Sequence, residues 1–227
     1  MISDILLLLL LILAYALFSM LSRRNDYLGG GDDNDAGNTC NITYYIEPSN
    51  LDPDFVSESN RIIQDSELKT KYNLTQKFDE SADIMIKLMP REEMIKLSNE
   101  KNKKPDTYPD GTPIRFSWTY QRYGSRNKPL IYIDSENWLK GVEQSGLSLI
   151  EYRRYVILHE FMHALGFDHQ KCDGSTAING VCPVMYQSTR GCPTGFKCGS
   201  NITIHDYKKR IPGAYVKCGA YRNNEWS

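Results

Sequence analysis

The sequence predicts one α+β domain preceded by an N-terminal appendage, and three observations support this prediction. Runs rich in β-branched and aromatic residues alternate with segments of helical spacing, as in folds that mix strands and helices. A chain of 227 residues, 41% of them hydrophobic, is large enough for a real core. The net charge of -1 argues against nucleic acid as a partner.

The strands are expected in the first and central parts of the domain. Strand-like runs lie at 41–46, 83–88, 115–121 and 130–134. The last two are joined by Gly124-Ser125-Arg126-Asn127, which predicts a hairpin or strand pair. Helices are expected after Pro53, after Pro90 and near 204–210, and the polar segment 101–113 is expected to be a loop.

A longer helix is predicted over 149–165. Ser148 and Glu151 form an S-x-x-E capping box at its start. Its apolar residues lie nearly all round the helix, which predicts that the helix is buried. These residues are Ile150, Val156, Ile157, Leu158, Phe161, Met162 and Leu165.

The most informative motif lies at the end of this helix and just beyond it. His159, Glu160, His163, Gly166 and His169 match the pattern H-E-x-x-H-x-x-G-x-x-H. Residues four apart share a helix face, so His159 and His163 can bind one ion while Glu160 stands beside its water ligand. Gly166 can adopt the left-handed conformation that ends a helix and so bring back His169 as the third ligand. Three protein ligands leave the fourth position to water, as in catalytic zinc sites.

The histidine inventory supports one zinc ion per chain. Only four histidines are present, and three of them belong to this motif. A bare H-E-x-x-H also occurs by chance, but the extended pattern fixes five positions. Zinc lowers the pKa of water to roughly 7, and Glu160 is the expected general base and then acid. His205 is expected to be a surface residue or to have local hydrogen bonds.

The zinc motif, followed by Pro183-Val184-Met185-Tyr186, resembles the metzincin clan of zinc peptidases, in which a Met-containing turn lies beneath the metal. Met185 stands at the matching place. The amino-acid sequence of the motif is most similar to that of matrixins and is also similar to that of astacins. The wider stretch 130–198 looks most like a secreted bacterial metzincin-like domain family of unassigned activity.

This resemblance implies a mixed twisted sheet, an active-site helix, a Met-turn and a loop-rich, disulfide-bonded C-terminal part. It also implies that substrate lies along an edge strand within 115–134, where Trp118 or Trp138 could line the cleft, although core packing is the commoner place for a Trp. The chain departs from astacins in having Gln187, not Tyr, two residues after Met185.

The N-terminal appendage is first apolar and then polar. Residues 5–21 form an uncharged run that is just long enough to span a bilayer and also suits a signal peptide. We expect a membrane signal anchor at 1–22, with a cleaved signal peptide and secretion as the alternative. A flexible Gly/Asp linker is expected at 23–39 and the peptidase domain at 40–227.

The topology signals disagree. Arg23 and Arg24 follow the apolar run and would place the domain in the cytoplasm by the positive-inside rule. Six cysteines instead indicate a disulfide framework and therefore an oxidising space. Glycosylation sequons at Asn41, Asn73 and Asn201 agree with the cysteines. We expect a single-pass protein whose domain faces an extracellular, lumenal or virion-surface space.

The disulfide pairing is inferred from the resemblance. The similar bacterial family has cysteines that correspond to Cys172 and Cys192 but not to Cys182 and Cys198, which implies the pairs Cys172–Cys192 and Cys182–Cys198. Cys40 and Cys218 remain, and they lie next to the two ends of the domain, so a bridge between them is expected. Spacing alone leaves all 15 pairings of six cysteines open.

The sequence therefore predicts a membrane-anchored zinc endopeptidase that acts on a protein or peptide substrate. Water activated by zinc would attack the peptide carbonyl with Glu160 as general base. The alternative is a zinc-binding, catalytically inactive surface or virion protein with a structural or binding role. The presence of Glu160, which is a base and not a ligand, favours the enzyme.

Overall fold

The computed structural model describes residues 41–100, 117–120 and 128–211. The chain divides into two units, Met1–Asn38 and Thr39–Ser227, and all described residues belong to the second. The expected anchor, linker and loop 101–113 lie outside the described residues, as do Cys40, Cys218 and the connection 121–127. Within the described ranges, no helix has the length and apolar character needed to cross a membrane.

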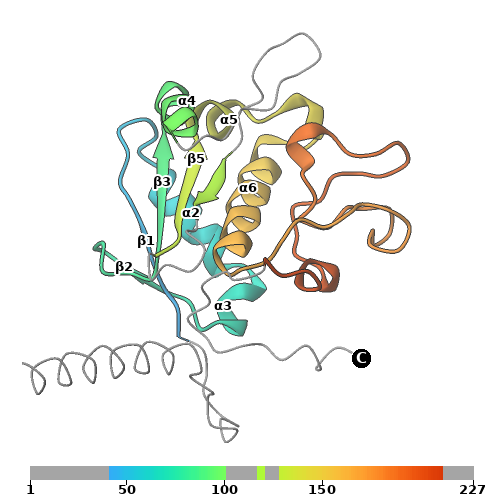
Figure 1. The fold of residues 1–227 in the computed structure, drawn as a ribbon, viewed down its shortest axis with the longest axis horizontal. Helices are drawn as coiled ribbons and strands as arrows, with labels where there is room; N and C mark the ends of the chain where they lie inside the picture. The colour runs from blue at the N-terminus through green and yellow to red at the C-terminus, as the bar shows by residue number, and fades with distance from the viewer. Residues whose placement is uncertain (1–40, 101–116, 121–127, 212–227) are drawn as a thin grey trace, which may run out of the picture. The chain divides into compact units, whose positions relative to one another are not determined.

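The described part is a mixed α/β fold (Figure 1). Its elements in chain order are β1 (Thr43–Ile46), α2 (Phe55–Gln64), α3 (Glu67–Lys71), β2 (Thr75–Lys77), β3 (Ile84–Met89), α4 (Arg91–Glu100), β4 (Trp118–Tyr120), β5 (Leu130–Asp134), α5 (Ser135–Lys140), the 3₁₀ turn η1 (Glu143–Ser145), α6 (Leu149–Ala164), and the 3₁₀ turns η2 (Ser188–Arg190) and η3 (Ile204–Tyr207).

A five-stranded mixed sheet has the order β2-β1-β3-β5-β4. The strands β2, β1, β3 and β5 are parallel, and β4 joins the edge antiparallel to β5. In this last pair Trp118 lies opposite Tyr132 and Thr119 opposite Ile131. The edge strand β4 also contacts α6.

One face of the sheet carries the core. Burial alternates along the strands, so every second side chain packs inward while the others are half-buried. The inward residues are Tyr44, Ile46, Ile84, Ile86, Leu88, Ile131 and Ile133. They form one cluster with the buried faces of α2 and α6, and the rings of Tyr44 and Phe161 meet edge to face at 5.8 Å.

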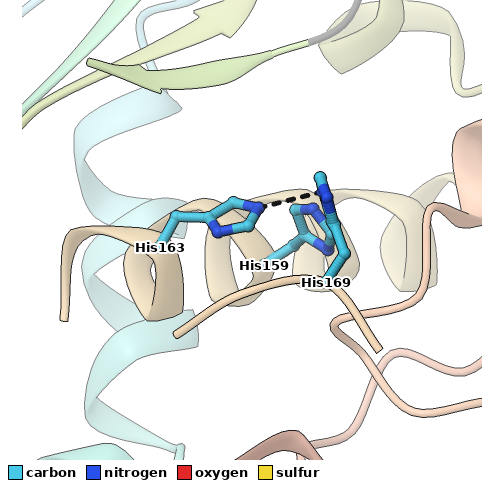
Figure 2. A group of neighbouring side chains, drawn as sticks. All are labelled: His159, His163 and His169. Atoms are coloured by element: carbon cyan, nitrogen blue, oxygen red, sulfur yellow. Dashed lines mark hydrogen bonds between the residues drawn. The ribbon is translucent and has the colours of Figure 1, made fainter. Parts of the chain in front are cut away.

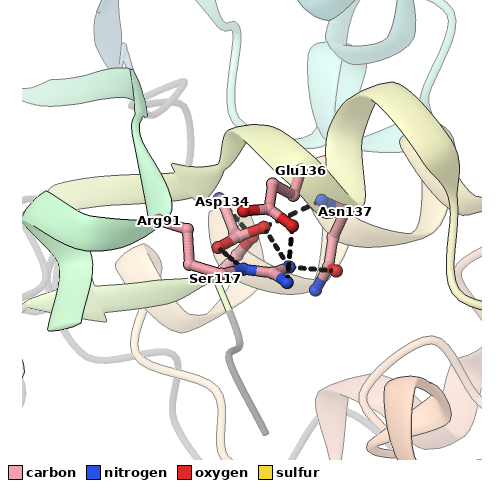
Figure 3. A network of polar contacts seen from close by, with 5 residues as sticks. All are labelled: Arg91, Ser117, Asp134, Glu136 and Asn137. Atoms are coloured by element: carbon pink, nitrogen blue, oxygen red, sulfur yellow. Dashed lines mark hydrogen bonds and ion pairs between the residues drawn. The ribbon is translucent and has the colours of Figure 1, made fainter. Parts of the chain in front are cut away.

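A polar network fixes α4 and α5 at the end of β5 (Figure 3). The buried Asp134 carboxylate accepts two hydrogen bonds from Arg91, from Nη2 at 2.8 Å and from Nε at 3.1 Å. It also caps α5 by accepting from the Asn137 amide, while its own amide donates to Ser117 Oγ. Arg91 further pairs with Glu136 at 2.8 Å. This bidentate pairing compensates the buried charge and orients the chain that leads into β4.

The α+β pattern predicted from the sequence is largely confirmed. The strands β1, β3, β4 and β5, the helix after Pro53, and α4 all lie within two or three residues of the expected ranges. The elements α3, β2 and α5 were not predicted, because each has only three to six residues and therefore too few positions to show a period. The expected helix near 204–210 is the short 3₁₀ turn η3.

Candidate metal centre

The helix α6 begins and ends as the sequence predicts. Ser148 and Glu151 form both hydrogen bonds of the capping box. At the other end Gly166 has φ 87°, and the amides of Gly166 and Phe167 donate to the carbonyls of His163 and Met162. These two bonds form a Schellman motif, which turns the chain back toward the helix.

One correction concerns the first turn of α6. Ile150 is predicted as part of a buried apolar face, but its side chain is 69% exposed. The neighbouring Leu149 and Glu151 are also exposed, whereas burial is continuous from Tyr155 to Met162. The apolar pattern therefore predicted burial correctly for the later turns of α6 but wrongly for its first turn.

The three histidines of the motif come together (Figure 2). Ligand nitrogens of His159, His163 and His169 all lie within 4.8 Å of one another, and the Nε2 atoms of His163 and His169 are 3.1 Å apart. His159 is buried, whereas His163 and His169 are half-buried. The cluster therefore lies at the edge of the core with one side toward solvent.

Backbone carbonyls orient two of the imidazoles. His159 Nδ1 lies 2.7 Å from the carbonyl of Val184, and His163 Nδ1 lies 2.7 Å from that of Phe167. Because a carbonyl can only accept, each Nδ1 carries the proton and each Nε2 keeps its lone pair. In metal sites, a hydrogen bond from the ring nitrogen that does not bind the metal fixes the tautomer and the ring plane of a histidine ligand. The two carbonyl contacts have this arrangement.

The protonation state also suits a ligand. Burial lowers the pKa of His159 well below its usual 6.5, and the nearby His163 and His169 lower it further. Burial likewise lowers the pKa of His169, although the adjacent Asp168 acts in the opposite direction. Both imidazoles are therefore neutral at pH 7, the form that binds a metal ion.

The geometry fits zinc. Nitrogens bound at about 2.0 to 2.1 Å around a tetrahedral ion lie about 3.3 Å from one another. The 3.1 Å separation of the Nε2 atoms of His163 and His169 is close to this value, and the ligand nitrogens of all three histidines lie within 4.8 Å of one another. A set of three imidazoles is also a donor set that zinc accepts in catalytic sites.

Glu160 follows His159 on α6 and is held by the edge strand. Its side chain is buried, with 4% of its surface exposed. The hydroxyl of Thr119 on β4 lies 2.9 Å from Glu160 Oε2 and 2.7 Å from the Glu160 carbonyl oxygen. The carboxylate is thus positioned between α6 and the sheet edge.

The turn at Met185 is buried and closely tied to the histidines. The Val184 carbonyl contacts His159, and the Met185 carbonyl accepts from the amide of Gln170, next to His169. The Met185 amide in turn donates to the buried Asp206 carboxylate at 2.7 Å. This turn therefore orients one ligand directly and holds the loop that carries another.

The side chains of Asp206 and Tyr155 both hold this turn. Asp206 also accepts from the amide and hydroxyl of Thr203, and burial raises its pKa although these donors lower it. Tyr155 on α6 donates to the Tyr186 carbonyl and accepts from the Ser188 amide. Burial raises the pKa of Tyr155, so its hydroxyl keeps the proton it donates.

The predicted disulfide pairing around the turn is wrong. The bonds are Cys172–Cys182 and Cys192–Cys198, not Cys172–Cys192 and Cys182–Cys198. A tight hairpin explains the first bond, because Ile178 and Val181 exchange both backbone hydrogen bonds around Asn179-Gly180.

The central residues of this hairpin, Asn179 and Gly180, have φ 53° and 75°. Positive φ at both positions is typical of an Asn-Gly type I′ turn, which returns Cys182 to Cys172. The Asn-Gly dipeptide was the sequence signal for this bond.

The other predicted residues lie away from the cluster. Asn41, Asn73 and Asn201 are exposed, the amides of Asn41 and Asn73 hydrogen-bond to each other, and Asn201 accepts from Arg154. Their glycosylation stays a prediction. His205 is half-buried on η3 and is not part of the metal-ligand cluster that the described residues form.

The two tryptophans have different surroundings. Trp138 is fully buried in the core and donates to Asp52, so it does not line a cleft. Trp118 is half-buried on β4 with its ring beside that of Tyr132.

Three residues that contribute to the site were not predicted from the sequence. Thr119 lies within a predicted strand, but only the register shows that it faces α6. Asp206 is 21 positions from Met185, and no local motif links the two. Tyr155 lies among the apolar residues of a buried helix, so the sequence pattern did not indicate its role. The T-x-x-D pattern of Thr203 and Asp206 was the available signal, because it forms a capping box on η3.

The described part is thus a mixed α/β fold with a three-histidine cluster, two members of which lie on α6 and the third on the turn that follows it. A family model described as "Protein of unknown function (DUF3152)" matches residues 94–218, more than half of the chain. The chain belongs to this family. The match contains α6, all three histidines and the turn at Met185. A comparison with curated proteins finds no significant match.

Proposed function

We propose that this protein is a zinc-dependent endopeptidase of the metzincin type. The observation that carries the proposal is the buried carboxylate of Glu160, the residue that follows His159 on α6, together with three convergent histidine side chains. A purely structural zinc site needs four protein ligands and no base, whereas three ligands and an adjacent carboxylate are the set required for hydrolysis. The buried Met185 turn in contact with the ligand loop supports the same assignment.

Each residue has a distinct role in this mechanism. His159, His163 and His169 would hold the metal through their imidazole nitrogens. Zinc, when bound, acts as a Lewis acid that activates water and polarises the substrate carbonyl. Glu160 accepts the proton from the attacking water and passes it to the leaving amine. The carbonyls of Val184 and Phe167 keep the ligand rings in place through both steps.

The rival function is a zinc-binding protein without turnover, at a surface or in a virion. The same cluster would serve it, but nothing in such a role requires the buried carboxylate. A carboxylate with 4% exposure costs stability unless it is compensated, and here its compensation includes a hydroxyl from the edge strand. The enzyme therefore accounts for one more feature of the site than its rival.

The two disulfides bear on the compartment. Bonds of this kind persist in oxidising spaces and are rare in the cytosol. Cys172–Cys182 and Cys192–Cys198 both flank the proposed metal centre. As part of the same proposal, the domain works in an extracellular, lumenal or virion-surface space, anchored or secreted through its N-terminal segment.

The decisive experiment combines zinc content with peptide cleavage. The purified chain should contain one zinc per molecule, and His163→Ala should lose most of it, because two ligands cannot complete the site. Glu160→Gln should keep the zinc and the fold yet cleave a random peptide library about 10² to 10⁴ times more slowly. Metal analysis and mass spectrometry of the digested library measure both quantities.

The outcomes separate the two functions. Full zinc with no cleavage in the wild-type chain would support the non-enzymatic rival. Unchanged cleavage by Glu160→Gln would exclude the mechanism. A full equivalent of zinc in His163→Ala would exclude the assignment of the ligands.

A further inference from the structure

The edge strand β4 brings the hydroxyl of Thr119 to the proposed catalytic base. Thr119 lies opposite Ile131 in the antiparallel pair, and paired residues project to the same face of a sheet. Ile131 is fully buried on the face that packs against α6. The neighbouring Trp118 and Tyr120 therefore project to the other face, and Thr119 is the residue of β4 that reaches Glu160.

The contact is specific to the hydroxyl. Thr119 Oγ1 lies 2.9 Å from Glu160 Oε2 and 2.7 Å from the Glu160 carbonyl oxygen. Both partners are acceptors and the hydroxyl has one proton, so it can donate to the side chain, to the backbone or to both in a shared bond. In each case the same group ties the carboxylate to the backbone position from which it projects.

We propose that Thr119 is a positioning residue that holds the Glu160 carboxylate in the orientation needed for proton transfer. This inference rests on the proposed peptidase function. Glu160 has three side-chain torsions, and a hydrogen bond to Oε2 fixes the carboxylate plane and with it the position of Oε1. A base displaced by about 1 Å can lose as much as 10² in rate, so this bond affects turnover more than substrate binding.

The variant Thr119→Val tests the proposal because it keeps the branched shape and removes only the hydroxyl. It should keep one zinc and lower kcat about 10- to 100-fold, with KM within about twofold. Thr119→Ser restores the hydroxyl and should keep kcat within about threefold of the wild-type value. The matched control is Thr75→Val on β2, the opposite edge of the sheet, which should leave kcat unchanged.

A second measurement is independent of turnover. Acetohydroxamate binds a zinc ion and gives its proton to an adjacent base, so its affinity for the zinc-loaded chain reports the placement of Glu160. Thr119→Val should weaken this affinity about fivefold, the effect of one lost hydrogen bond. In a Glu160→Gln background the same change should have little further effect, because Thr119 would act through Glu160.

Each outcome decides the inference. Wild-type kcat and hydroxamate affinity in Thr119→Val would overturn it, and so would equal losses in the Val and Ser variants or additive losses with Glu160→Gln. If the chain binds zinc and hydroxamate but cleaves no peptide, the hydroxamate cycle alone still tests the role of Thr119. If the chain binds no zinc, the proposed function fails first and takes this inference with it.

Discussion

Residues 41–165 and residues 166–211 both contribute to the three-histidine cluster, but different interactions hold them. The first region has the sheet, α2 and α6, and its inward side chains form one continuous apolar cluster. The second region has only 3₁₀ turns and isolated bridges as regular structure. Its side chains Phe167, Val184 and Met185 join the same apolar cluster. The rest of this region is held by a buried carboxylate, two disulfides and a few backbone hydrogen bonds to α6 and to itself.

This difference has a consequence for the metal centre. An apolar core is redundant, because many small contacts share the stabilisation and the loss of one methyl group costs little. A loop held by single polar contacts has no such reserve. Substitutions of apolar core residues in the first region should therefore lower stability with little effect on zinc affinity, whereas substitutions that release the Met185 turn or the His169 loop in the second region should lower both.

The largest effect is expected for Asp206→Ala. The change leaves the amides of Met185 and Thr203 without their acceptor, and two buried unsatisfied donors cost about 3 kcal/mol of unfolding free energy. Because the Met185 turn orients His159 and the His169 loop, zinc affinity should fall about 10- to 100-fold. Urea unfolding and competition with a zinc chelator measure the two quantities.

The matched control is Ile131→Val, which removes one methyl group from the centre of the sheet. Its cost should be about 1 kcal/mol, with zinc affinity unchanged. If both variants lose zinc affinity in proportion to stability, the two regions behave as one unit and the distinction fails.

The same contrast explains what the sequence could predict. β-rich composition predicted β1, β3 and β5, helical spacing after Pro53 predicted α2, and a capping box followed by apolar residues predicted α6. Each of these signals lies within one short segment and reflects local burial. The three histidines and Glu160 were predicted for a similar reason. Their spacing is local, so a helix and one glycine turn suffice to bring the histidines together.

Contacts between distant positions were not predictable in this way. Nothing periodic links Thr119 to Glu160 or Asp206 to Met185, since both pairs depend on how separate elements pack. The predicted disulfide pairing was wrong for a related reason. The pairing was inferred from which cysteines a similar family shares, whereas the Asn179-Gly180 hairpin determines which cysteines meet.

Removal of the disulfides provides a second test of the difference between the two regions. Removal of either bond as a double Cys→Ala variant should cost about 2 to 3 kcal/mol in the chain-entropy model, because both close short loops. The loss of Cys172–Cys182 should also weaken zinc binding several-fold, since this bond joins the His169 loop to the chain that enters the Met185 turn. The loss of Cys192–Cys198 should leave zinc affinity unchanged.

Peptide mapping without reduction checks the pairing itself. Fragments that link Cys172 to Cys182 and Cys192 to Cys198 are expected. A fragment that links Cys172 to Cys192 would restore the pairing inferred from the resemblance and contradict the structure. Equal loss of zinc affinity in the two double variants would show that both bonds affect zinc binding only by stabilising the loop region as a whole.

The smallest effect is expected at the start of α6, where an exposed and a buried position of the first region can be compared on one helix. Ile150 is 69% exposed, so Ile150→Gln removes little buried surface and should change the unfolding free energy by less than about 0.5 kcal/mol. Gln is also a good helix former, so the first turn is kept. Ile157 on the same helix is buried, and Ile157→Gln should cost several times more because it places an amide in the core. Urea unfolding of both variants tests the exposed start directly. A cost above about 1.5 kcal/mol for Ile150→Gln would mean that the first turn is covered in the full chain, as the apolar pattern of the sequence predicted.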